Sequence, residues 1–135
     1  MIKLKGDMIE VLDKIALVSC SGLSPLGLVV RAATVELALD NDNIVAACIT
    51  EYSAHPNKCS AILDDAKIVS VTGCGDDCVS AILETKNISV VKNIDADMLI
   101  NAYDLHPNDA IRLDGDGEEA VRLLKKFILK EIEAI

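Results

Sequence analysis

The chain has 135 residues, of which 51% are hydrophobic and only 2% aromatic, and its formal net charge is −9. This length is typical of one domain whose core is large enough to fold without disulfide bonds. The negative charge argues against binding to nucleic acid or to an anionic membrane surface, because the phosphate groups of both repel an acidic protein.

The N-terminal residues contain two lysines but lack the apolar segment of a signal peptide. No apolar run has the length of a membrane span, since polar residues, Gly and Pro interrupt the longest one, residues 15–30. We therefore expect a cytoplasmic protein, in which thiols stay reduced. The five cysteines then favour metal or thiol chemistry over a disulfide framework.

The first predicted strand covers residues 15–20, an aliphatic run that ends in a cysteine. Ser24 is expected to cap the helix that follows, because Pro25 stands at the first helical position, where a missing N–H is tolerated. This helix should extend to about residue 39, since apolar residues recur at helical spacing. They are Leu28, Ala32, Val35 and Leu39.

Strands and helices alternate along the rest of the chain. The strands are predicted at residues 44–49, 67–72 and 88–91. The helices are predicted at residues 57–65, 75–85, 97–103 and 114–134. The alternation predicts a single α/β domain over residues 1–135. We expect three α/β/α layers around a mainly parallel four-stranded sheet, in a Rossmann-like arrangement with right-handed crossovers.

Three of the cysteines stand at the ends of predicted strands, namely Cys20, Cys48 and Cys74. The carboxyl ends of parallel strands meet at one edge of the sheet, which is where such folds bind ligands. Cys78 follows Cys74 by four residues, at the start of a predicted helix whose positive end favours the thiolate form. The sequence therefore predicts that thiols far apart in the chain gather at one edge of the sheet.

Each of these cysteines also has a simpler interpretation. The spacing of Cys74 and Cys78 indicates zinc less strongly than a doubled Cys-x2-Cys motif, and both could be buried as small apolar residues. Cys20 precedes a glycine–serine segment, which resembles the phosphocysteine loop of phosphotransferase-system IIB subunits. Phosphatase and Walker loops are both excluded there, because Leu26 and Leu28 stand where arginine and lysine are required.

The remaining cysteine and the two histidines are expected to be bystanders. His55 and Cys59 share a helical face by spacing, but a polar helix start and a core position explain them more simply. His106 is expected in a loop. The acids from Asp114 to Glu119 lack the spacing of a calcium loop and indicate a solvated helix start.

The chain resembles the DGC-domain family over its first two-thirds. The matching segments are Val18-Ser19-Cys20-Ser21-Gly22, Arg31-Ala32-Ala33, Cys48, and residues 68–83 with Gly73-Cys74-Gly75-Asp76-Asp77-Cys78. The family pattern is a strand, Asp-Gly-Cys, three residues, a cysteine and a helix. Here Thr72 replaces the aspartate, Gly75-Asp76 replace the usual Pro-Leu, and Leu23 stands where many members have a further cysteine. The resemblance implies metal binding by Cys20, Cys48, Cys74 and Cys78, and no particular reaction.

Three functions are compatible with these features. The first is metal binding by the four thiolates, with zinc as the expected ion and copper(I) or an iron–sulfur cluster as alternatives. Backbone N–H groups at the helix starts near Pro25 and Gly75 would then offset the thiolate charge. The second, with no metal, is a thiol-dependent enzyme or a carrier of phosphate, sulfur or redox equivalents with Cys20 or Cys74 as nucleophile. The third is an acidic interaction module with merely buried cysteines. We favour the first; the sequence specifies neither a substrate nor a protein partner.

Overall fold

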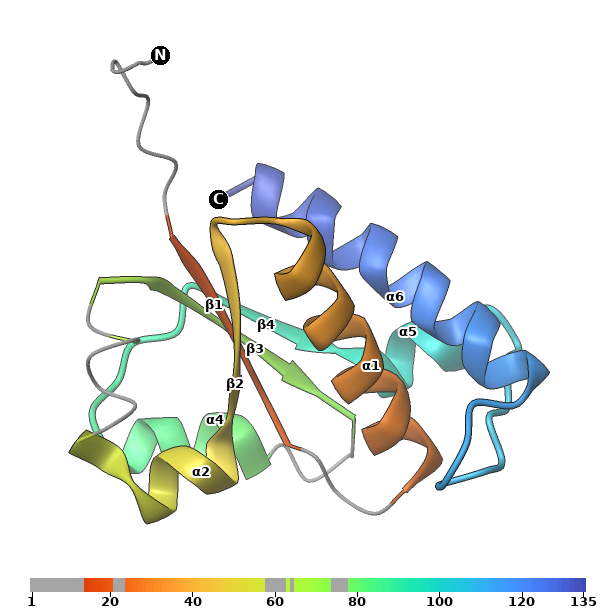
Figure 1. The fold of residues 1–135 in the computed structure, drawn as a ribbon, viewed down its shortest axis with the longest axis horizontal. Coiled ribbons are helices and arrows are strands. Elements are labelled where there is room, and N and C mark those ends of the chain that lie inside the picture. The colour runs from red at the N-terminus through yellow and green to blue at the C-terminus, as the bar shows by residue number, and fades with distance from the viewer. Residues whose placement is uncertain (1–13, 21–23, 58–62, 64, 74–77) are drawn as a thin grey trace.

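The computed structural model describes residues 14–20, 24–57, 63, 65–73 and 78–135 (Figure 1). Four parallel strands form one sheet in the order β2-β1-β3-β4. They are β1 (Ile15–Ser19), β2 (Ile44–Cys48), β3 (Lys67–Thr72) and β4 (Lys92–Asp95). The predicted α/β class and the parallel four-stranded sheet are confirmed.

Helices cover both faces of the sheet, as predicted (Figure 1). The described helices are α1 (Pro25–Asp40), α2 (Ile49–Ala54), α4 (Cys78–Thr85), α5 (Ala96–Ala102) and α6 (Gly115–Glu133). One apolar cluster joins the sheet to α1, α5 and α6, and a second joins it to α2 and α4. No helix in the described part of the chain is long and apolar enough to cross a membrane.

The central strand β1 shows why the sheet is buried on both sides. All five of its residues are buried. Ile15 and Leu17 belong to the cluster on the α1 face, whereas Ala16 and Val18 belong to the cluster on the α2 face. Successive side chains of a strand point to opposite faces, so a continuous aliphatic run is what a strand between two helical layers requires.

Helix α1 has nearly the predicted bounds, and Ser24 caps it by accepting a hydrogen bond from the Gly27 N–H (2.9 Å). The stripe of apolar residues used to predict this helix is nevertheless not its core face. Val35 is 43% exposed and Leu39 is 79% exposed. The buried residues are Gly27, Val29, Val30, Ala33, Thr34 and Leu37. Helix α1 is therefore apolar on two sides, and the side formed by these buried residues is the one that packs on the sheet.

The fourth strand was predicted four residues too early. Ile88 and Val90 pack against the α2/α4 cluster from an irregular segment, and the Val91 N–H bonds to the Ile68 carbonyl just ahead of the ladder. The strand itself is Lys92-Asn93-Ile94-Asp95, in which only Ile94 is buried. Because an edge strand can be largely polar, β4 itself gave a weak strand pattern. The apolar residues before it gave a stronger pattern and were wrongly predicted to be the strand.

Helix α2 follows β2 without a loop and was not predicted. Ile49, which was expected in the strand, is its first residue and is buried together with Tyr52 at i+3. Most of the helix predicted at residues 57–65 lies outside the described residues. The predictions for the last two helices are confirmed by α5 and α6 to within a residue or two at each end.

Candidate functional site

The ends of β1 and β2 bring two cysteines to one edge of the sheet. Ser19, the last residue of β1, pairs in register with Cys48, the last residue of β2. Cys20 follows Ser19 directly. Because the two strands are adjacent and parallel, Cys20 and Cys48 both lie at the carboxyl edge, where α1 also begins (Figure 1). Both residues are partly buried, and neither is in a disulfide.

The two cysteines approach this edge from different faces of the sheet. Ile44 belongs to the α1-side cluster, and alternation along β2 assigns Cys48 to the same side. Cys20 packs against the cluster on the α2/α4 side. Their thiols can therefore reach a common atom only over the strand ends, not within either helical layer.

Cys78 is exposed and lies in the first turn of α4 (Cys78–Thr85), which confirms its predicted place at the start of a helix. The predicted opening of that helix at residues 75–77 lies outside the described residues. Helix α4 packs on β3, so Cys78 belongs to the same side of the sheet as Cys20. Cys74 and Cys59 lie outside the described residues. Within the described part of the chain, no group of three or more His, Cys, Asp or Glu side chains is close enough to hold a metal ion.

Neither of the two histidines belongs to a strand end that carries a cysteine. His55 is the exposed C-cap residue of α2. His106 lies in the loop before α6, also exposed, with its Nε2 atom 2.8 Å from Asp104 Oδ1. The prediction that His106 is a loop histidine is confirmed.

The start of α1 offers fewer hydrogen-bond donors to this edge than expected. Pro25 has no N–H, and the Gly27 N–H is already bonded to the Ser24 hydroxyl. The Leu28 N–H bonds to the Ser24 carbonyl. Among the first three helical positions, only the N–H of Leu26 has no partner inside the helix start. Helix α1 can therefore offer one backbone N–H donor to an anion at this edge.

Gly73 holds the end of β3 against the first turns of α1. A Cβ atom at this position would lie 3.1 Å from the Leu26 carbonyl oxygen and 3.1 Å from Val30 Cγ2. Only glycine permits this approach without a shift of the helix. The close contact sets the position of α1 beside the strand ends, and thereby the place of its first turn.

Acidic residues at the start of α6 fix the loop that precedes this helix. Asp114 caps the helix through the Gly117 N–H (2.7 Å) and also accepts a hydrogen bond from the Asn108 N–H (2.9 Å). Asp116 accepts one from the His106 N–H (2.8 Å). The bonds from Asn108 and Gly117 lower the pKa of the Asp114 carboxyl. The prediction that these acids form a solvated helix start is confirmed, and two of them also hold the preceding loop.

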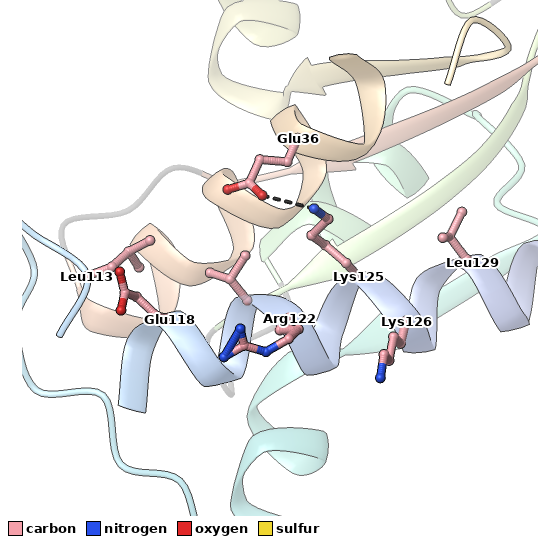
Figure 2. A pocket seen from close by; sticks show the side chains of 8 residues that line it. Glu36, Leu113, Glu118, Arg122, Lys125, Lys126 and Leu129 are labelled. Atoms are coloured by element: carbon pink, nitrogen blue, oxygen red, sulfur yellow. Dashed lines mark hydrogen bonds and ion pairs between the residues drawn. The ribbon is translucent and has the colours of Figure 1, made fainter. Parts of the chain in front are cut away.

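A hollow of about 610 Å³ opens between α1 and α6, in the helical layer (Figure 2). Its lining residues are Glu36, Leu113, Glu118, Val121, Arg122, Lys125, Lys126 and Leu129, none of them a cysteine. Lys125 points toward α1 and bonds to Glu36 (2.9 Å), whereas Arg122 and Lys126 point away from it (Figure 2). The hollow is therefore a groove lined by residues of both charges, and it is separate from the strand ends that carry Cys20 and Cys48.

The comparison with known families gives a direct result. A model of the DGC domain matches residues 16–122, which is most of the chain. The chain belongs to the DGC-domain family. No curated protein and no solved structure shows significant similarity to it. The matched residues include the strand ends and all five cysteines of this DGC domain.

Thr72, which stands in place of the aspartate of the DGC pattern, has a structural partner. It is buried, and its hydroxyl donates a hydrogen bond to the Ile94 carbonyl of β4 (3.4 Å). The residue opposite Thr72 in the register is Asp95, which caps α5 through the Met98 N–H (3.2 Å). This DGC domain thus has a carboxylate at the same edge, one strand further along. Sequence reasoning missed Asp95 because the fourth strand was predicted too early.

Proposed function

We propose that this DGC domain binds a metal ion, with zinc as the expected metal, through Cys20, Cys48, Cys74 and Cys78. The observation that carries the proposal is the placement of Cys20 and Cys48 at the ends of adjacent parallel strands. Residues that are 28 positions apart in the sequence have thereby become neighbours at the edge where open α/β sheets bind ligands.

The donor set fits a soft divalent ion. None of Cys20, Cys48 and Cys78 is in a disulfide, and they come from the end of β1, the end of β2 and the start of α4. They are not yet close enough together to hold a metal among the described residues, so the proposed site requires their side chains to move together when the ion binds. Cys20 and Cys48 come from opposite faces of the sheet, and a tetrahedral ion seated over the strand ends is compatible with this arrangement. Four thiolates would form a closed site of the structural type, whereas three would leave a position for a water molecule and allow catalysis.

Charge is the main cost of such a site. Four thiolates around a divalent ion leave two excess negative charges in a chain whose net charge is already −9. The Leu26 N–H is the donor that the start of α1 can supply, because Pro25 has none and Gly27 is occupied. A ligand set of three thiolates, with one excess negative charge, would need less of this compensation. Thiolate ligands also require a reducing compartment, so we propose that the protein acts in the cytoplasm.

The test is the metal content of protein purified without a histidine tag and without chelators. We expect about one zinc ion per chain, and its loss when Cys48 or Cys78 is replaced by serine. The matched control is Cys59→Ser, which removes a thiol that is not among the proposed ligands and should retain the metal.

Two results would contradict this function. Metal-free protein with one thiol that alkylates rapidly near neutral pH would instead support the thiol-dependent enzyme or carrier with Cys20 or Cys74 as nucleophile. Metal-free protein whose thiols all react slowly would support the third function, an acidic interaction module with buried cysteines. Iron or copper in place of zinc in the same metal analysis would indicate an iron–sulfur cluster or copper(I). That result would change the proposed metal but would retain the proposed cysteine site.

A further inference from the structure

The outward face of α1 carries an apolar stripe that the fold covers only in part, since Ala32 packs against the edge of the core and the C-terminal half of the stripe is exposed. It consists of Leu28, Ala32, Val35 and Leu39, and we call it the α1 stripe. Val35 is 43% exposed and Leu39 is 79% exposed, while Leu28 and Ala32 are partly buried. The opposite side of α1 packs on the sheet, and α6 lies beside it in the same layer (Figure 1). A helix that is apolar on both sides is typical of one that is covered on both sides.

The spacing within the α1 stripe is that of a coiled-coil seam. Its residues are separated by four, three and four positions, which is the alternation of d and a positions in a heptad. This is a narrow seam suited to one facing helix, rather than the broader apolar face that α1 turns to the sheet.

Two charged residues flank the α1 stripe and indicate which helix fits it. In this heptad register Arg31 occupies a g position and Glu36 the following e position, five residues later. In a parallel pair of helices such residues meet across the seam, so Arg31 of each copy would face Glu36 of the other. An antiparallel pair would instead bring like charges together.

Both flanking side chains are available for this pairing. Arg31 is exposed and makes no ion pair among the described residues. The Glu36 side chain is 46% exposed, and one of its carboxylate oxygens binds Lys125 (2.9 Å). This bond leaves the second oxygen for Arg31 and restrains the Glu36 side chain before association, which lowers the entropy cost of pairing.

We infer that the α1 stripe binds a second copy of this chain, with the two α1 helices parallel about a two-fold axis. The interface is isologous, and it buries Val35 and Leu39 of each copy against their counterparts. Because the seam spans only about a heptad and a half, and each copy has a net charge of −9, the dimer is weak and concentration-dependent.

Sedimentation equilibrium over a range of concentrations tests the dimer. We expect wild-type protein to dimerise, and Val35→Glu and Arg31→Glu each to raise the dissociation constant about tenfold or more. The first variant buries a charge, and the second places two carboxylates across the seam. The matched control is Met98→Glu, on α5, because Met98 is 71% exposed and apolar but lies outside the α1 stripe. Circular dichroism checks that each variant retains the fold.

Cross-linking tests the orientation. Parallel helices bring the two copies of position 32 together at the seam, so Ala32→Cys should form a 32–32 disulfide on mild oxidation, identified by peptide mass spectrometry. Monomers at every concentration, or a dimer that Val35→Glu leaves intact, would overturn the inference. A dimer that depends on Val35 but forms no 32–32 link would overturn the parallel arrangement. None of these outcomes depends on metal binding.

Discussion

Gly73→Ala should destabilise the protein because it drives β3 and α1 apart. The added Cβ would lie 3.1 Å from a backbone oxygen and from Val30 Cγ2, whereas ordinary contact begins at 3.4 Å. The first turn of α1 must therefore move by a few tenths of an ångström. Overpacking of this kind costs about 1–3 kcal/mol, and the lower entropy of the unfolded alanine chain offsets about 0.4–1 kcal/mol of it. We expect a net loss of about 1–2 kcal/mol in the free energy of unfolding.

Urea unfolding of the metal-free protein, followed by far-ultraviolet circular dichroism because the chain has no tryptophan, measures this loss. The matched control is Gly115→Ala at the start of α6, where a Cβ would meet nothing within 4 Å. This control should be neutral or stabilising by up to about 1 kcal/mol. If Gly73→Ala proves as stable as Gly115→Ala, the close approach of β3 and α1 is not as described.

Two further predictions concern helix caps. Ser24→Ala should cost about 1 kcal/mol by leaving the Gly27 N–H without its acceptor, while Ser53→Ala, at an exposed position in α2, should change little in the same urea assay. The hydrogen bonds that lower the pKa of Asp114 stabilise the folded state above the pKa of this carboxyl in the unfolded chain, and this contribution is lost as the pH falls through the folded pKa. In Asp114→Asn, the urea midpoint should therefore fall less on acidification than it does in the wild-type protein. An equal fall in both proteins would contradict the stabilising role of the Asp114 carboxylate.

The topology could be predicted because strands between two helical layers have a distinctive sequence. Residues 67–72 were predicted without error, since five of the six are buried. An apolar run led to a wrong prediction for β4, because Ile88 and Val90 are apolar and pack against the core but lie before the strand. Helix α2 was missed because an apolar run gives no sign of where a strand passes directly into a helix.

For the candidate site, the sequence predicted the edge but not its details. The alternation of elements implied parallel strands and so a shared edge for Cys20 and Cys48, whereas the sequence did not specify that β1 and β2 are neighbours, which the structure shows. The approach of the two cysteines from opposite faces depends on the register of Ser19 with Cys48, and no composition or motif encodes it. The outward α1 stripe was also beyond prediction, because periodicity finds a helix face without telling which side meets the core.

Replacement of the bound metal by cobalt(II) tests the central claim most directly, because the visible absorption of this ion reports both its geometry and its thiolate ligands. We predict one cobalt(II) ion per chain, the intense ligand-field absorption of a tetrahedral site, and a thiolate-to-metal charge-transfer band that weakens in Cys48→Ser but not in Cys59→Ser. Wild-type protein that binds no cobalt(II), or binds it without a thiolate charge-transfer band, would contradict a metal site at the carboxyl edge of the sheet.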